Sequence, residues 1–187
     1  MKAFIDEVSD GKLRSGEIGL RYLFNTFDDV NRPDLVLQMA SQEEHPSYMR
    51  FLRRGETTLL EFWQDECRSK CHDMLGSILE WFYAAILGLK PDGDGYLTFT
   101  LSPPYESEFG SVYGTVECPY GHIVVDFQRL NDRIFLSFSI RMSTTATVVL
   151  PKDFNSYELK RQGTRMEAAF VGSIVLKHGR YTLDMRH

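Results

Sequence analysis

The chain has 187 residues, 43 % of them hydrophobic, with 26 acidic and 21 basic residues and a net charge of −5. This composition is typical of a globular protein that can bury a core. Without a basic run to neutralise phosphates, we expect no nucleic acid partner. Three cysteines (Cys67, Cys71 and Cys118) cannot all pair within the chain, so we expect reduced thiols rather than a disulfide framework.

The N-terminal sequence carries no visible secretion signal, because Asp6 and Glu7 come before any apolar stretch of signal-peptide length. The longest apolar run, residues 77–89, contains Glu80 and is shorter than the roughly 20 residues that a bilayer span needs. We therefore expect no membrane partner, and a cytoplasmic location if Met1 is the natural start of the chain.

The first half of the chain has the apolar spacing of helices. Helices are expected over residues 15–31, 33–42, 47–53 and 73–89. Ser15 can cap the first, whose apolar positions are Ile18, Leu20, Leu23, Phe24 and Phe27, and Pro33 suits the first turn of the second. The fourth is apolar around most of its circumference and needs neighbours on nearly every side. Four such pieces are too few to cover themselves, which indicates the edge of a larger helical assembly.

The period of the apolar residues changes to two after residues 90–96, where Pro91, Gly93 and Gly95 break the backbone pattern. We place the boundary here, with a helical domain over residues 1–92 and a strand domain over residues 93–187.

Strands are expected downstream over residues 97–101, 112–117, 123–128, 134–141, 146–150, 168–176 and 180–185. Cys118-Pro119-Tyr120-Gly121 suits a type I turn, and Asn131-Asp132 suits a tight hairpin. Helices followed by strands, without alternation of the two, predict an α+β fold: an N-terminal α-helical segment followed by an antiparallel β-sandwich.

Residues 55–72, GETTLLEFWQDECRSKCH, hold an unusual number of reactive side chains. Glu61 lies among apolar neighbours, so partial burial is expected to raise its pKa and make it usable for proton transfer. If the segment is helical, Asp65 shares a face with Glu61 and each makes the other harder to ionise. A solvated surface acid is the alternative for Glu61, because most carboxylates are exposed.

The two cysteines and His72 in this segment make a poor metal site. Cys67, Cys71 and His72 supply three ligands, and the adjacent pair Cys71-His72 cannot easily converge with Cys67 on one ion. A cysteine nucleophile paired with His72 is disfavoured too, because adjacent helical residues point about 100° apart. We expect no metal and no cofactor; His72 alone is more often a structural histidine with a backbone partner.

Four elements occur in a defined order: Pro46-Ser47, Gly55-Glu56-Thr57-Thr58-Leu59-Leu60-Glu61-Phe62-Trp63, Ser69-Lys70-Cys71-His72 and Leu87-Gly88-Leu89-Lys90-Pro91. With a sandwich after them, they resemble the C-terminal part of bacterial α-L-rhamnosidases, inverting glycoside hydrolases with a six-hairpin α/α barrel followed by a β-sandwich domain. The resemblance covers nearly the whole chain. It implies that residues 1–92 are a partial α/α barrel, the last hairpins of the six.

The resemblance also implies roles for three residues. Glu61 falls on the family's general base, which activates the water that attacks the anomeric carbon; His72 falls on a histidine that contacts rhamnose, and Trp63 falls near an aromatic wall of the subsite. The implied partner is a rhamnose-containing glycan or glycoside. Leu60 replaces the usual tryptophan, and the interval from Glu61 to His72 is short. The family's general acid comes from farther upstream, so this chain alone is expected to be a poor catalyst or none.

Two other functions remain open. The sandwich can serve as a non-catalytic carbohydrate-binding module if Tyr105, Tyr113 or Tyr120 is exposed and stacks on sugar, although tyrosines more often pack in a core or turn. Alternatively, the chain is an interaction module whose exposed helical face is covered in a homodimer or by a missing N-terminal barrel segment.

Overall fold

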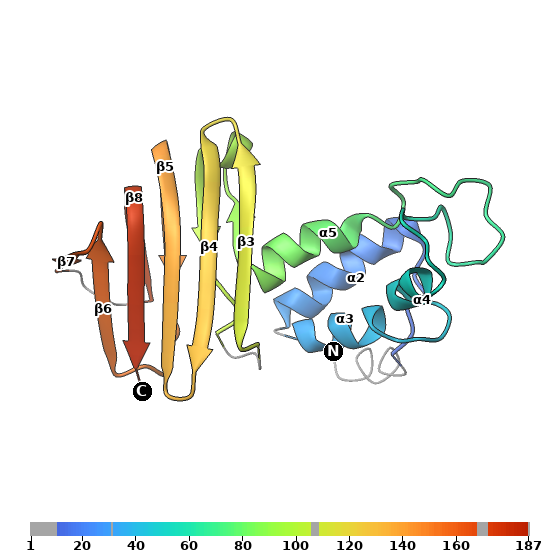
Figure 1. The fold of residues 1–187 in the computed structure, drawn as a ribbon, viewed down its shortest axis with the longest axis horizontal. Helices are drawn as coiled ribbons and strands as arrows, with labels where there is room; N and C mark the ends of the chain where they lie inside the picture. Colours follow the sequence, from blue (N-terminus) through green and yellow to red (C-terminus); the bar gives the residue numbers. More distant parts are fainter. Residues whose placement is uncertain (1–10, 31, 106–108, 168–171, 187) are drawn as a thin grey trace. The chain divides into compact units, whose positions relative to one another are not determined.

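The computed structural model describes residues 11–30, 32–105, 109–167 and 172–186. The chain divides into two compact units, Met1–Phe82 and Tyr83–His187 (Figure 1). The first unit contains helices and the second contains the β-sheet. The domain boundary after residue 92 stays a prediction.

The described helices of the first unit are α2 (Glu17–Asp29), α3 (Pro33–Ala40), α4 (Tyr48–Arg53) and α5 (Ser77–Trp81). A π-helical turn, Phe82–Ile86, continues directly from α5. Gly16, not Ser15, occupies the N-cap of α2, and no side chain caps that helix. Ser47 caps α4, since its hydroxyl accepts a hydrogen bond from the Arg50 amide at 3.2 Å. Helices α3 and α5 both pack against α2.

The buried face of α2 is narrower than its apolar residues indicate. Leu20, Leu23, Phe24 and Phe27 are buried, whereas Ile18 is 77 % exposed. The buried four follow the spacing of one helical face, and Ile18 points about 200° away from Leu20. Ile18 is therefore an apolar position of α2 that lies outside its buried face.

The expected fourth helix is shorter than residues 73–89, because residues 74–76 form a turn before α5 begins at Ser77. Ile78 and Trp81 are buried, while Leu79 and Phe82 remain exposed. One apolar face is thus covered within the described part of the first unit, and another face carries large apolar side chains in contact with solvent.

The second unit contains an eight-stranded sheet in its described residues. The strands are β1 (Leu89–Pro91), β2 (Thr98–Leu101), β3 (Ser111–Cys118), β4 (Gly121–Leu130), β5 (Arg133–Val149), β6 (Ser156–Arg161), β7 (Thr164–Met166) and β8 (Ser173–Arg186), with a 3-10 turn at Asp94–Tyr96. The strands expected over residues 134–141 and 146–150 are both part of one long strand, β5. Those expected over residues 168–176 and 180–185 fall on another long strand, β8. The expected positions 168–171 lie outside the described residues.

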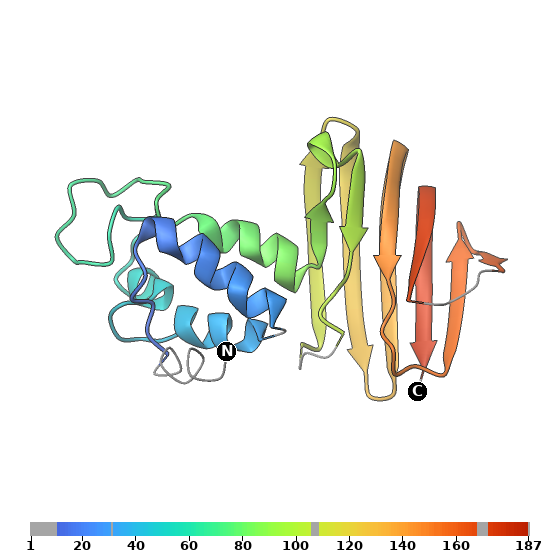
Figure 2. The ribbon, with the colours of Figure 1, turned by 180° about the vertical axis from the view of Figure 1, so that it is seen from behind.

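The long strands give the sheet the form of a sandwich. The first half of β5 pairs with β4 antiparallel, and its second half pairs with β2 in parallel. A register shift between Ile140 and Thr145 separates the halves, and β8 pairs with both. Such a bulge bends a strand and lets it pass from one layer to the other. Figure 2 shows the green β1–β2 pair in front of the yellow strand β4.

The predicted fold class is confirmed, with one parallel pair, β2 with β5, among the described strands, which otherwise pair antiparallel. Both predicted tight turns are present: Cys118 pairs with Gly121 around Pro119-Tyr120, and Leu130 pairs with Arg133 around Asn131-Asp132. Alternate residues of β4 and β5 enter one apolar core that includes Ile123, Val125, Phe127, Leu136 and Phe138.

Candidate functional site

The segment of residues 55–72, which we call the site segment, contains no helix or strand. It follows α4 and projects as a long loop from the helices (Figure 1). Two backbone hydrogen bonds join its two sides, from the His72 amide to the Leu59 carbonyl at 2.9 Å and from the Glu61 amide to the Ser69 carbonyl at 3.2 Å. These bonds bring Glu61 and His72 onto neighbouring stretches of backbone although eleven positions separate them.

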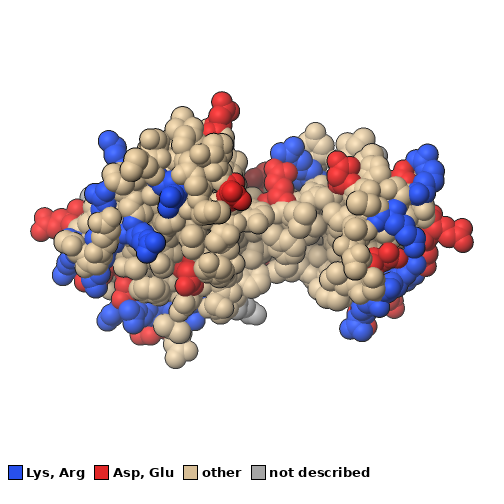
Figure 3. Space-filling view, turned by 45° about the horizontal axis from the view of Figure 1, so that its top comes forward, with Lys and Arg blue, Asp and Glu red and all other residues tan. Residues whose placement is uncertain are grey.

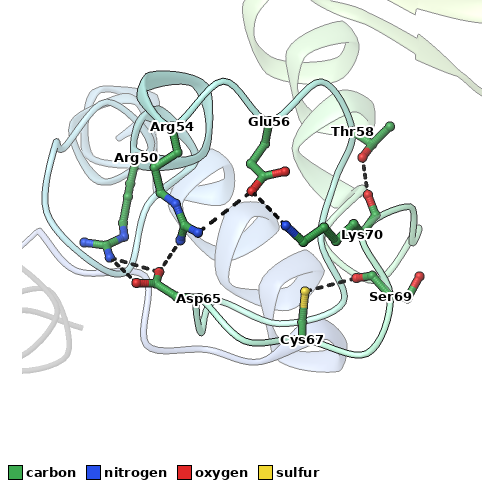
Figure 4. A network of polar contacts seen from close by, with 8 residues as sticks. All are labelled: Arg50, Arg54, Glu56, Thr58, Asp65, Cys67, Ser69 and Lys70. Carbon is green, nitrogen blue, oxygen red and sulfur yellow. Dashed lines mark hydrogen bonds and ion pairs between the residues drawn. The ribbon is translucent and has the colours of Figure 1, made fainter.

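Asp65 anchors the site segment to α4 (Figure 4). Its carboxylate accepts two hydrogen bonds from Arg50 Nη2, at 2.9 and 2.7 Å, and pairs with Arg54. The guanidinium of Arg50 holds the pKa of Asp65 below its ordinary value. The segment is therefore not helical, and Asp65 faces arginines instead of sharing a helix face with Glu61.

A second set of polar contacts closes the base of the site segment (Figure 4). Glu56 lies 3.9 Å from Arg54 and 3.7 Å from Lys70, and the Thr58 hydroxyl donates to the Lys70 carbonyl. The Cys67 thiol donates to the Ser69 carbonyl at 3.1 Å. Side chains from both sides of the segment thus hold it together without regular secondary structure.

Glu61 is the one acidic residue that is buried among the described residues, with 6 % of its surface exposed. Its Oε1 accepts a hydrogen bond of 2.5 Å from Arg68 Nη2, whereas Oε2 has no hydrogen-bond partner in the parts of the chain that the structure describes. Arg68 holds the pKa of Glu61 below its ordinary value, and His72 adds a smaller effect in the same direction. The expectation of a raised pKa is wrong, because the hydrogen bond from Arg68 outweighs the desolvation of the carboxylate.

His72 lies near the surface beside this carboxylate, with 28 % of its side chain exposed. Its Nδ1 accepts a hydrogen bond from the Met74 amide at 3.3 Å and lies 3.2 Å from the exposed carboxylate of Asp73. The histidine therefore has the backbone partner that a structural role requires. Its ring also lies close enough to Glu61 to influence the carboxylate electrostatically.

Trp63 is buried, with 7 % exposure, and belongs to an aromatic group. Its ring stacks on the ring of Phe51, with 5.6 Å between the ring centroids, and meets the ring of Tyr48 edge-on, with 5.0 Å between the centroids. Its Nε1 donates a hydrogen bond to the Ser15 carbonyl at 2.9 Å. These contacts fix the backbone two residues after Glu61. Its proximity to a sugar subsite stays a prediction.

No three His, Cys, Asp or Glu side chains lie together in a metal-binding arrangement within the described ranges. All three cysteines are free thiols. None of the helices that the structure describes is both long enough and apolar enough to cross a membrane. Lys and Arg side chains and Asp and Glu side chains both occur on the face shown in Figure 3, with wide areas of other residues between them.

The three tyrosines considered for sugar stacking have different environments. Tyr105 is buried, and its hydroxyl donates to the Val149 carbonyl at 2.8 Å, so it is not an exposed platform. Tyr120 is half-buried in the turn between β3 and β4. Tyr113, on β3, is 69 % exposed.

Arg68 is the residue of this site that the sequence alone did not reveal. It follows Glu61 by seven positions, a spacing with no meaning in a helix or strand, and only the fold of the irregular loop brings the two together. The single available signal was its position as a cation between an acid and a histidine in the same motif.

Two family models match the chain. One describes the bacterial alpha-L-rhamnosidase 6 hairpin glycosidase domain and matches residues 3–86; the other describes the bacterial alpha-L-rhamnosidase C-terminal domain and matches residues 88–165. An alpha-L-rhamnosidase of Formosa agariphila is 29 % identical over 162 residues, which are 81 % of this chain and 17 % of the relative. One of Alteromonas sp. is 29 % identical over 157 residues, or 79 % of this chain and 17 % of the relative.

Solved structures show the same arrangement. The α-L-rhamnosidase of Streptomyces avermitilis complexed with L-rhamnose is 25 % identical with a TM-score of 0.80, over 97 % of this chain and 19 % of that one. The α-L-rhamnosidase of Dictyoglumus thermophilum, 20 % identical, shares the fold with a TM-score of 0.85, over 100 % of this chain and 23 % of that one.

The chain spans about a fifth of the length of these relatives. The order of its two matched regions, helical and then β-sandwich, is the order of the two family models. The chain belongs to the bacterial α-L-rhamnosidase family and corresponds to the C-terminal part of its members.

Proposed function

We propose that this chain is the C-terminal portion of an α-L-rhamnosidase-like glycoside hydrolase that acts on a rhamnose-containing glycan or glycoside. Glu61 is the general base that activates water for attack on the anomeric carbon, and His72 and Trp63 belong to the substrate-binding part of the site. The general acid comes from a barrel segment outside this chain, so the chain alone is inactive.

The buried carboxylate of Glu61 carries this proposal. A general base must be ionised before it can accept a proton, and Arg68 keeps Glu61 ionised by lowering its pKa. Arg68 occupies Oε1 and leaves Oε2 without a partner among the described residues, so Oε2 is the atom that accepts the proton from water. In inverting glycosidases the base stands roughly 6.5–9.5 Å from the acid, which leaves room for that water.

The hydrogen bond from the Met74 amide to His72 supports a role for His72 as a donor to the sugar. Because Nδ1 accepts from the Met74 amide, the neutral ring carries its proton on Nε2. An Nε2–H group donates to a sugar hydroxyl. The alternative contact of Nδ1 with Asp73 involves a carboxylate in full contact with water, where ion pairs contribute little. Trp63 supports the site through its packing with Tyr48 and Phe51, which holds the backbone two residues after Glu61.

The test is reconstitution of activity on an aryl α-L-rhamnoside. The chain alone should show negligible turnover, and turnover should appear when it replaces the matching part of the Streptomyces avermitilis relative. Glu61→Gln should then lower turnover about 10²- to 10⁴-fold, because water loses its proton acceptor. Glu66→Gln, an exposed acid of the same segment, is the matched control and should leave turnover unchanged. Robust turnover by the isolated chain, or an active Glu61→Gln chimaera, contradicts the proposal.

The exposed ring of Tyr113 favours a second function, a non-catalytic carbohydrate-binding module. An aromatic ring on a sheet face offers apolar area for stacking on a sugar. Glycan binding that survives Glu61→Gln and His72→Ala but is lost in Tyr113→Ala would favour this second function over the first. Glycan binding that is lost in Glu61→Gln and His72→Ala but survives Tyr113→Ala would favour the hydrolase.

The helical unit also has an apolar surface that needs a partner. A hollow with a volume of about 490 Å³ lies between α3, α4, residues 56–59 and the side chains of Ile78 and Phe82. Large apolar patches rarely stay uncovered in a monomer. We propose the missing N-terminal barrel segment as its cover, since the matched family domain has six hairpins, with a homodimer of this chain as the alternative. Light scattering that shows a monomer at high concentration excludes the homodimer.

A further inference from the structure

A hollow of about 410 Å³ opens on the outer face of the sandwich where β4 and β5 separate. The two strands pair from Leu130 and Arg133 as far as Val125 and Phe138. Beyond that point β5 turns into the second layer, while β4 continues beside β3. The Val124 amide then donates to the Ser139 hydroxyl at 3.0 Å instead of to the backbone of β5. The departure of a strand from its layer thus creates the hollow.

The side chains around this hollow form a cationic and hydroxyl-rich site. Its lining residues are His122, Val124, Ser137, Phe138, Ser139, Arg141 and Arg180. No carboxylate is among them, and neither arginine has an ion pair within the ranges that the structure describes. An arginine that is not paired is free to bind an oxyanion through two parallel N–H groups.

The strand register places the two arginines around one position. Arg180 lies opposite Ser139, and Arg141 follows Ser139 by two residues on the same face of β5. Diagonal neighbours in a sheet lie about 7–8 Å apart, within reach of one ligand for side chains as long as arginine. A Cβ atom at Gly121 would lie 2.8 Å from Arg141 Nε, so the guanidinium lies across the turn between β3 and β4.

The hydroxyl groups and the neighbouring acids limit where an anion can bind. Because Ser139 Oγ accepts from the Val124 amide, its own proton is available for donation to a ligand. Glu117 lies opposite His122, and Asp126 lies opposite Ser137 and accepts from the Gln128 amide group. An anion is therefore favoured between Arg141 and Arg180, away from both acids.

We propose that this hollow binds the anionic group, a carboxylate or a sulfate ester, of an acidic sugar unit. The position of Tyr113 favours a sugar as the molecule that carries the anionic group. Tyr113 lies opposite Asp126, which lies opposite Ser137, so Tyr113 is on the same sheet face as the hollow and about 10 Å from Ser137, two strand spacings away. Its exposed ring is placed to stack on the next sugar unit. The choice of a sugar rests on the proposed function, whereas the anion site rests on the arginines.

The experiment is an NMR titration of the full chain with sodium glucuronate, glucose 6-sulfate, the neutral methyl ester of glucuronate and inorganic sulfate. The two acidic sugars should shift the amide signals of residues 122–124 and the side-chain Nε–H signals of Arg141 and Arg180. Arg141→Gln and Arg180→Gln should each weaken this binding at least about tenfold. The neutral ester should bind at least about tenfold more weakly than glucuronate.

Arg165→Gln is the matched control, because it removes one positive charge from an exposed position on β7, outside the hollow. It should bind both acidic sugars as the unchanged chain does. Equal weakening by Arg165→Gln, no binding of either acidic sugar, or inorganic sulfate binding as tightly as the acidic sugars would overturn the proposal. Glu61→Gln should leave this binding intact. Failure of the proposed anion site can therefore be distinguished from failure of the proposed hydrolase function.

Discussion

The β-sandwich and the site segment are held in shape by different forces. The sandwich has one cluster of buried apolar side chains and continuous backbone ladders. The site segment has two backbone hydrogen bonds between its sides, and its acids pair with arginines that are partly exposed (Arg50 and Arg54) or largely exposed (Arg68). Apolar burial contributes about 25 cal/mol per Å², whereas exposed ion pairs contribute about 0–1 kcal/mol each. Stability therefore resides mainly in the sandwich, and the candidate chemistry lies on a segment whose buried apolar side chains, among the described residues, are Leu60 and Trp63.

A core truncation in the sandwich should have the largest effect on stability. Phe127 is fully buried and meets Tyr105 at 6.2 Å between ring centroids. Phe127→Ala should lower the free energy of unfolding by about 3–5 kcal/mol, because it removes apolar contacts and leaves a cavity. Urea denaturation measures the change. Leu130→Ala, at an exposed position of the same strand, should stay within about 0.5 kcal/mol. Equal losses in the two variants would contradict this view of the sandwich.

An ion pair in the sandwich should have an intermediate effect. Burial raises the pKa of Asp184, but bonds of 2.7 and 2.6 Å from Arg133, with Arg186 nearby, hold that pKa below its ordinary value. Asp184→Asn should lower the free energy of unfolding by about 1–2 kcal/mol near pH 7, since the pair is partly exposed.

The pH dependence of this pair has a defined sign. A carboxylate with a lowered folded-state pKa stabilises the fold above its unfolded pKa, and the contribution disappears as pH falls through the folded value. The difference between the unchanged chain and Asp184→Asn should therefore shrink below about pH 4. Glu117→Gln, at an exposed position, is the control and should show no such pH-dependent difference. A constant difference down to pH 2 would contradict the role given to the charge.

The smallest effect on global stability is expected from Asp65→Asn in the site segment. Losing the charge weakens the ties to Arg50 and Arg54, so the loop should loosen while α4 and the sandwich stay folded. Proteolysis within residues 55–72 should become faster, with little change in the urea midpoint. Acidification below the ordinary carboxyl range should do the same in the unchanged chain, because the pKa values of Asp65 and Glu61 are both lowered. Glu66→Gln serves as the control; equal proteolysis of all three chains would refute the anchoring role.

Regular apolar alternation made much of the sandwich predictable. Ile123, Val125 and Phe127 point into the core as their spacing indicates, and the turns at Pro119-Tyr120 and Asn131-Asp132 are where their residue types place them. Strands β1, β6 and β7 were missed because they are short or carry few buried residues; β6 buries Leu159 alone. The bulge after Ile140 interrupts the alternation of apolar and polar residues along β5, so the sequence pattern predicts two strands where the structure has one.

The site segment was less predictable, because its contacts join residues without a regular spacing. The motif around Glu61 correctly indicated a buried carboxylate. The pairings of Glu61 with Arg68 and of Asp65 with Arg50 depend on the path of an irregular loop, and no periodic pattern records that path. The sign of the shift in the Glu61 pKa depends on this partner, so burial alone gave the wrong direction.

The two long strands give the sandwich a mechanical property of its own. Since β5 and β8 each run through both layers, neither layer can separate without breaking the hydrogen bonds that begin in the other. The layers therefore open as one cooperative unit, and amide protons on both sides of the bulge after Ile140 should exchange with solvent only through the same global opening. A single unfolding transition of the sandwich is built into its strand connectivity.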